Sequence, residues 1–213
     1  MVRVKICGIT RKEDALVALE AGAHALGLVF YPESPRYVDP EYARWLVPSL
    51  PPLVSWVGVF VNRSVEEMVV TARGVGLDTL QLHGDEEPRV CRACLVEGFK
   101  VIKAIRVASE KDLEWLDRYR GSVSAILLDT RIPGRYGGTG QTFHWRLAAK
   151  VGDAPVILAG GLTPDNVTQA IEEVHPWGVD VSSGVERTPG VKDHRLVELF
   201  VRRAIGLEVR SKR

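Results

Sequence analysis

The chain has 213 residues, of which 46% are hydrophobic and 26% charged, with a formal net charge of +1 at pH 7. This size suits a single α/β barrel, and so small a charge gives no long-range attraction to nucleic acid, so we expect a small-molecule partner and no nucleic acid. No apolar run is long enough for a membrane segment, the start lacks a signal-peptide layout, and three cysteines do not suggest a disulfide framework. We therefore expect a cytoplasmic protein.

Apolar runs of strand length alternate with segments of helical spacing. The predicted strands, in chain order, are residues 2–7, 24–30, 54–61, 78–83, 100–105, 124–129, 154–160 and 178–183. The predicted helices are residues 11–22, 40–50, 64–76, 86–98, 109–121, 143–152, 164–175 and 194–206. Alternating strands and helices favour parallel pairing, and this number of units predicts an eight-stranded parallel (β/α)8 TIM barrel. We expect one barrel domain over residues 1–206 and a short basic tail over 207–213.

The alternative architecture is a doubly wound open sheet. No G-x-G-x-x-G sequence follows the first predicted strand, so a dinucleotide site of that fold has no support. In a (β/α)8 barrel the site lies on the loops that follow the C-terminal ends of the strands. Candidate functional residues are therefore sought at those ends.

The first predicted strand ends in KICGIT. Side chains alternate along a strand, so Val4 and Ile6 share one face, and Lys5 and Cys7 share the other. If the apolar face packs on helices, Cys7 points toward the barrel axis at a strand end, and Gly8 lets the chain turn there. We expect Lys5, on the same face, to lower the pKa of the thiol.

Polar residues also stand at the ends of three other predicted strands. In QLHG, Gln81 and His83 alternate with leucines and share the inward face. Asp129 in SAILLD and Asp180 in GVDVSS alternate onto the same face. These polar groups are predicted to converge on one rim of the barrel.

Glycine-bearing turns follow the seventh and eighth predicted strands. Gly160 and Gly161 lie in AGGLTPDN, and Ser183 and Gly184 lie in SSGVE. Glycines let an anion approach the unpaired backbone N–H groups of such turns, and these two loops are the usual phosphate site of the barrel. The loop GRYGGTGQTF, with Gly138, offers a third set of donors. A phosphorylated substrate is predicted.

Each candidate also has a purely structural interpretation. Cys7 could be a small buried hydrophobe, and His83 could form a hydrogen bond in the core. Asp129 and Asp180 could be helix caps or ion-pair partners, and Arg36, in YPESPRYV, could be a solvated charge. The position of Cys7 at a strand end favours its functional interpretation, whereas Asp180 lies deeper in its strand.

The ordered set of motifs resembles the phosphoribosylanthranilate isomerase family of tryptophan biosynthesis. These motifs are KICGIT, SPRYV, QLHG, LLD, GGTG, AGGL and DVSSGVE with PGVKD. The resemblance implies an isomerase that converts N-(5-phosphoribosyl)anthranilate to 1-(2-carboxyphenylamino)-1-deoxyribulose 5-phosphate by an Amadori rearrangement. It implies acid/base catalysis without a cofactor, and we expect a monomer or a homodimer.

Site roles follow from the resemblance. The cysteine that matches Cys7 is the general base in the family, the aspartate that matches Asp129 is the general acid, and the arginine that matches Arg36 holds the anthranilate carboxylate. We expect Gln81, His83 and Asp180 to contact substrate, and the glycine turns to bind its phosphate. One departure is FHW, with His144, where the family has FDW. A histidine at a helix start opposes the helix dipole, so we expect it to affect local stability rather than activity.

Other functions are less well supported. Cys91 and Cys94 have C-x-x-C spacing inside a predicted helix without two further ligands, so no metal site is expected. The related histidine-pathway isomerase, or a bifunctional form of it, has an aspartate where this chain has Cys7. A metal-dependent epimerase would need several histidines and aspartates at strand ends, and only His83 is well placed. A non-catalytic sensor of a phosphorylated ligand would not need Cys7 and Asp129.

Overall fold

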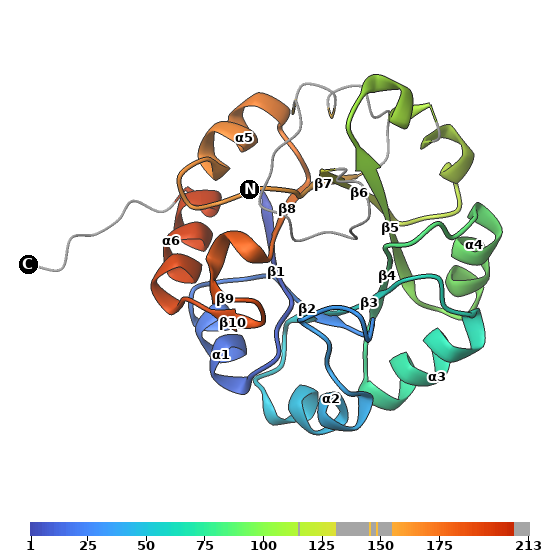
Figure 1. Ribbon diagram of the computed structural model, residues 1–213, viewed down its shortest axis with the longest axis horizontal. Coiled ribbons are helices and arrows are strands. Elements are labelled where there is room, and N and C mark those ends of the chain that lie inside the picture. Colours follow the sequence, from blue (N-terminus) through green and yellow to red (C-terminus); the bar gives the residue numbers. More distant parts are fainter. Residues whose placement is uncertain (115, 131–144, 146–147, 149–154, 207–213) are drawn as a thin grey trace, which may run out of the picture.

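Eight parallel strands form a closed barrel in the order β1 to β8, with helices around it (Figure 1). The computed structural model describes residues 1–114, 116–130, 145, 148 and 155–206. The strands are β1 (Arg3–Cys7), β2 (Ala25–Val29), β3 (Ser55–Phe60), β4 (Thr79–Leu82), β5 (Lys100–Val107), β6 (Ala125–Thr130), β7 (Val156–Leu158) and β8 (Gly178–Val181). The predicted (β/α)8 barrel is confirmed.

Helices cover the outside of the barrel in the described part of the chain (Figure 1). They are α1 (Lys12–Glu20), α2 (Pro40–Leu46), α3 (Val65–Val75), α4 (Pro88–Val96), α5 (Val167–Val174) and α6 (His194–Ile205). Short 3-10 helices follow at Val47–Ser49, Glu110–Leu113, Leu116–Tyr119 and Ser183–Val185. The predicted helix over 143–152 lies largely outside the described residues, as do His144 and the tail at 207–213.

The single α-helix predicted over 109–121 is wrong. The described residues of this segment form the two 3-10 helices Glu110–Leu113 and Leu116–Tyr119. Their apolar side chains recur every third residue, at Leu113, Leu116 and Tyr119, and all three pack against the core. A period of three matches the 3-10 helix, whose side chains at i and i+3 lie on one face.

A small antiparallel ribbon between β8 and α6 was not predicted. It consists of β9 (Glu186–Thr188) and β10 (Val191–Lys192), which lie beside α1 in Figure 1. Gly190, with φ of +83°, makes the turn between them. The ribbon places a glutamate and a lysine close to the end of β1.

The strand alternation predicted for KICGIT is confirmed. Val4 and Ile6 belong to the large apolar core between the strands and the helices. Lys5 lies on the other face, where its side chain meets Asp180 of β8 inside the barrel. A smaller apolar cluster, Val57, Ile102, Ala104, Ala125, Leu127, Ile157 and Ala159, comes from β3 and β5 to β7 and the residue after β7. No helix in the described part of the chain is long and apolar enough to cross a membrane.

Candidate active site

A cavity at the C-terminal end of the barrel collects most of the predicted site residues. Those that line it are Cys7, Arg36, Gln81, His83, Asp129, Gly160, Asp180 and Ser183. Gly161 and Gly184 are not among its lining residues, and Gly138 lies outside the described part of the chain. Strand ends far apart in the sequence therefore contribute to one site.

Gly8 makes the first strand end compatible with this site. Its φ is +73°, a conformation that favours glycine. A Cβ atom there would also lie 2.6 Å from Cδ of Arg36 and 3.0 Å from Oγ of Ser182. Gly8 is therefore needed both to make the turn and to leave space for the aliphatic part of the Arg36 side chain.

Lys5 and Asp180 form a buried ion pair below Cys7. Nζ of Lys5 lies 2.8 Å from Oδ1 of Asp180. Burial is the largest influence on Cys7 and raises the pKa of its thiol, although Lys5 and Lys192 both act to lower it. Lys5 therefore acts to lower the thiol pKa, as predicted, but desolvation outweighs the attraction of the nearby cations and the net shift is upward.

A hydrogen-bonded chain joins β4 to β6. Nε2 of Gln81 lies 2.9 Å from Nδ1 of His83, and Nε2 of His83 lies 3.2 Å from Oδ2 of Asp129. If the Gln81 amide donates to Nδ1, the neutral imidazole carries its proton on Nε2 and donates it to Asp129. Oε1 of Gln81 has no hydrogen-bond partner among the described residues, so it remains available to a ligand.

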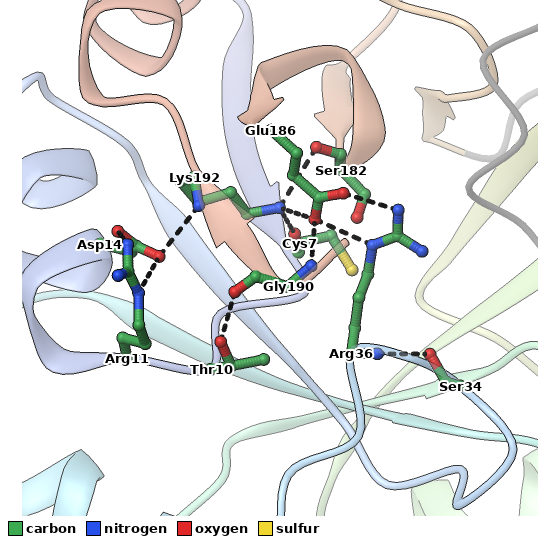
Figure 2. Close-up of polar contacts among 10 residues, drawn as sticks. All are labelled: Cys7, Thr10, Arg11, Asp14, Ser34, Arg36, Ser182, Glu186, Gly190 and Lys192. Atoms are coloured by element: carbon green, nitrogen blue, oxygen red, sulfur yellow. Dashed lines mark hydrogen bonds and ion pairs between the residues drawn. The ribbon is translucent and has the colours of Figure 1, made fainter. Parts of the chain in front are cut away.

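Arg36 is held by a glutamate that the sequence analysis did not single out. Its Nε and Nη2 atoms lie 2.9 Å and 2.7 Å from the two carboxylate oxygens of Glu186 (Figure 2). Lys192 donates to the same carboxylate at 2.8 Å and to the carbonyls of Cys7 and Ser182 at 2.6 Å and 3.2 Å. We call Arg36, Glu186 and Lys192 the β8-loop cluster.

Charge in this cluster shifts the acidity of its members. Burial alone would raise the pKa of Glu186, but hydrogen bonds and charges from Arg36 and Lys192 bring it below its ordinary value. Burial lowers the pKa of Lys192, although Glu186 opposes that shift. Glu186 lies in the motif GVE and Lys192 in PGVKD. The Pro-Gly pair between them is a turn signal that could have predicted the ribbon and these two residues.

The two glycine turns meet through their backbones. A Cβ atom on Gly184 would lie 1.9 Å from the carbonyl oxygen of Leu162, so no side chain fits there. In the other turn, Gly160 and Gly161 have φ of +78° and +67°. Asn166 stabilises it, since its amide donates to the Gly161 carbonyl at 2.9 Å. Glycine is thus required at position 184 for packing, whatever ligand the turns bind.

Cys91 and Cys94 lie away from the cavity. Both are fully buried in α4, and burial raises their pKa values to about 12 and about 11. Across the described residues, no group of three or more His, Cys, Asp or Glu side chains is arranged to hold a metal ion. These thiols are therefore core residues.

Comparison with known proteins identifies the family. The family model for N-(5'phosphoribosyl)anthranilate (PRA) isomerase matches residues 4–203. The isomerase of Geobacter sulfurreducens is 56% identical over 207 residues, which cover 97% of this chain and 100% of that protein. The isomerase of Thermotoga maritima is 50% identical over 209 residues, with coverage of 97% and 100%.

Solved structures agree with this relationship. The crystal structure of the T. maritima isomerase superimposes with a TM-score of 0.91 at 49% identity, covering 97% of this chain and 100% of that one. A crystal structure of a phosphoribosyl anthranilate isomerase in complex with reduced 1-(o-carboxyphenylamino)-1-deoxyribulose 5-phosphate gives a TM-score of 0.88 at 47% identity, with the same coverage. The chain belongs to the N-(5'-phosphoribosyl)anthranilate isomerase family, and it is an aldose–ketose isomerase of tryptophan biosynthesis.

Proposed function

We propose that Cys7 and Asp129 carry the acid/base steps of this isomerisation. The observation that supports the proposal is that both line one cavity together with Arg36, although they come from β1 and β6. Asp129 donates its proton to the ring oxygen, and the C1'–O bond breaks to give a protonated Schiff base. Cys7 removes the proton from C2', and the resulting enolamine takes up a proton and becomes the ketose.

The substrate's two anionic groups would bind to two different sets of residues in the site. Arg36 would hold the anthranilate carboxylate, since a guanidinium grips a carboxylate through two parallel hydrogen bonds. Backbone N–H groups near Gly160, Gly161, Ser183 and Gly184 would hold the phosphate. Gln81, His83 and Asp180 would contact the ribose, and Gly138 remains a predicted phosphate ligand.

We expect inorganic phosphate at millimolar concentration to raise the melting temperature of the protein, because it occupies the phosphate subsite only in the folded state. Gly184→Val is not a suitable test variant, since its side chain would collide with the Leu162 carbonyl even without a ligand. The measurement is a thermal melt with phosphate against chloride at equal ionic strength. An unchanged melting temperature would contradict the glycine turns as phosphate site.

The setting of the reaction is also a proposal. The T. maritima isomerase is described as dimeric, and we expect this chain to be a monomer or a homodimer in the cytoplasm. Acid/base steps by side chains require no cofactor, and the partner is a phosphorylated small molecule rather than nucleic acid.

The decisive experiment follows the loss of fluorescence of freshly made phosphoribosylanthranilate in the presence of the protein. Turnover by the wild type, and its loss by a factor of about 10² to 10⁴ in Asp129→Asn, would support the proposed acid. The histidine-pathway aminoaldose serves as a second substrate that the protein should not convert. Near-normal turnover in a folded Asp129→Asn variant would exclude Asp129 as the acid.

A further inference from the structure

Glu186 uses one particular edge of the Arg36 guanidinium. A guanidinium has five N–H donors in a planar fork, arranged along a side edge, Nε with Nη2, and an end edge, Nη1 with Nη2. The side edge donates to Glu186 at 2.9 Å and 2.7 Å. Nη1 makes no hydrogen bond to any described residue, and Arg36 lines the cavity. With respect to the described residues, the end edge can therefore donate two parallel hydrogen bonds to a carboxylate.

Glu186 itself is held in place from two directions. Its side chain is almost fully buried, and Lys192 binds Oε1 at 2.8 Å while Arg36 binds Oε2 at 2.7 Å. The backbone N–H of Gly190 adds a contact to Oε1 at 3.4 Å (Figure 2). Because both oxygens are engaged, rotation of the carboxylate would break several charge-assisted hydrogen bonds. Arg36 is thus fixed by a rigid partner.

Lys192 connects this partner to the backbone of the site. Only 1% of the residue is exposed, and its ammonium reaches the carbonyls of Cys7 and Ser182 as well as Glu186. The cluster contains two cations and one anion, so its net charge is positive by one unit when all three are ionised. Arg36 paired with Glu186 alone would be neutral, and an incoming carboxylate would then meet little net attraction.

We propose that Glu186 is a positioning residue that makes the site selective for a substrate bearing a carboxylate on its aromatic ring. It binds the side edge of Arg36 and so presents the end edge to the carboxylate, while Lys192 keeps the cluster positive. This rests on the proposed function, in which Arg36 binds the anthranilate carboxylate.

The sign of one substitution separates positioning from simple charge neutralisation. A glutamate that merely neutralised Arg36 would weaken carboxylate binding, and its conversion to glutamine would strengthen it. A positioning glutamate has the opposite effect, because the amide of glutamine cannot accept from both Nε and Nη2. Glu186→Gln should therefore weaken carboxylate recognition.

The experiment compares N-(5-phosphoribosyl)anthranilate with N-(5-phosphoribosyl)aniline, which lacks the carboxylate. The measured quantity is the carboxylate preference, defined as the ratio of kcat/KM for the two substrates. Glu186→Gln should lower the preference by roughly tenfold or more, mainly through the KM of the anthranilate compound. Arg36→Met should lower it by roughly 30- to 1,000-fold.

Glu86→Gln is the matched control. Glu86 is also a buried glutamate that binds a buried lysine at 2.8 Å, but it has no contact with Arg36. This variant should lower thermal stability and leave the carboxylate preference within about twofold of wild type. If Glu186→Gln fails to fold, Glu186→Asp replaces it, because the shorter side chain keeps the charge but cannot reach both nitrogens.

Each outcome has one meaning. An unchanged or increased preference in Glu186→Gln, or an equal loss for both substrates, would overturn the positioning role. A preference that survives Arg36→Met would instead refute the carboxylate role of Arg36 in the proposed function. Loss of preference in both variants, with the Glu86→Gln control unaffected, would support the inference.

Discussion

Two buried lysine–glutamate pairs in this barrel have nearly the same local geometry. Lys103 binds Glu86 at 2.8 Å and donates to the carbonyls of Leu82 and Gly84 at 3.2 Å and 2.7 Å. Lys192 binds Glu186 at 2.8 Å and likewise donates to two carbonyls at strand ends, those of Cys7 and Ser182. Each lysine therefore ties a loop to the end of a strand.

The glutamates make the difference between the two pairs. Glu86 turns back to the protein's own backbone, where it accepts from the N–H of Asn62 at 2.8 Å and of Gly84 at 3.0 Å. Glu186 reaches a third charged side chain, Arg36, which lines the cavity. The Lys103–Glu86 pair is neutral, and in the described part of the chain Glu86 makes no hydrogen bond to a residue that lines the site. Arg36, Glu186 and Lys192 together carry one surplus positive charge at the site. The same lysine–glutamate pair thus stabilises a loop in one place and orients a binding group in the other.

The largest effect is expected at Cys7, whose carbonyl oxygen accepts a hydrogen bond from Lys192. Cys7→Ser should lower kcat by a factor of about 10² to 10⁴, because a hydroxyl is a far poorer base than a thiolate. The fluorescence assay measures the change, and a thermal melt checks that the variant folds. Near-normal kcat would exclude the thiol as the base and leave Cys7 a small buried residue.

Removing either lysine tests the comparison directly. Lys103→Met should lower the free energy of unfolding by about 3 to 5 kcal/mol, because it leaves the buried Glu86 without its cation. Lys192→Met should lower it by less, because Glu186 keeps its ion pair with Arg36. Urea denaturation measures that loss. Only Lys192→Met should also raise the KM of the anthranilate substrate, since it removes the surplus positive charge. An equal rise in KM in both variants would show that the two clusters do not differ in function.

The sequence predicts the faces of the strands but not the partners within the site. Side chains alternate with a period of two, so Cys7, Gln81 and Asp129 could be assigned to the barrel interior from their own strands. Arg36 and Glu186 are separated by 150 residues, and their pairing depends on closure of the barrel and on a short ribbon. Local pattern carries no information about such a contact.

The sequence pattern also does not predict how deeply a side chain is buried. The lowering effect of Lys5 on the Cys7 thiol was predicted correctly, but the net upward shift of the thiol pKa was not, because it depends on the depth of burial. The spacing of Leu113, Leu116 and Tyr119 fits the observed 3-10 helices, but apolar residues at i and i+3 also occur on the face of an α-helix. The sequence pattern therefore did not distinguish the two kinds of helix.

A smaller effect on stability is expected at Asp14 of α1, which binds the backbone of Lys192. Asp14 is fully buried, and its carboxylate accepts from the backbone N–H of Lys192 at 3.0 Å and from Arg11 at 2.6 Å. Burial alone would raise the pKa of Asp14, but these hydrogen bonds and one from His194 bring it below its ordinary value. Asp14→Asn should lower the free energy of unfolding by about 1 to 3 kcal/mol at pH 7.

The pH dependence of this loss has a defined sign. A carboxyl with a lowered folded-state pKa stabilises the protein fully above its ordinary pKa of about 3.9, and that stabilisation disappears as the pH falls through the folded value. The wild type and Asp14→Asn should therefore differ at pH 7 and converge below about pH 4. Urea denaturation at several pH values measures the difference, and a constant gap down to pH 3 would contradict the assignment to Asp14.

The smallest effect is expected on the rate at which the Cys7 thiol is alkylated, which depends on the charge of Lys192. Burial raises the pKa of Cys7 above its ordinary value of about 8.5, so its alkylation by iodoacetamide should accelerate about tenfold per pH unit from pH 6.5 to 8.5 without levelling off. Cys91 and Cys94 are fully buried and should stay unmodified in the folded protein.

Lys192 lowers the Cys7 pKa, so Lys192→Met should slow alkylation of Cys7 severalfold, while Lys103→Met should leave its rate unchanged. Peptide mass spectrometry measures both rates, and equal slowing in the two variants would remove the electrostatic distinction between the two clusters.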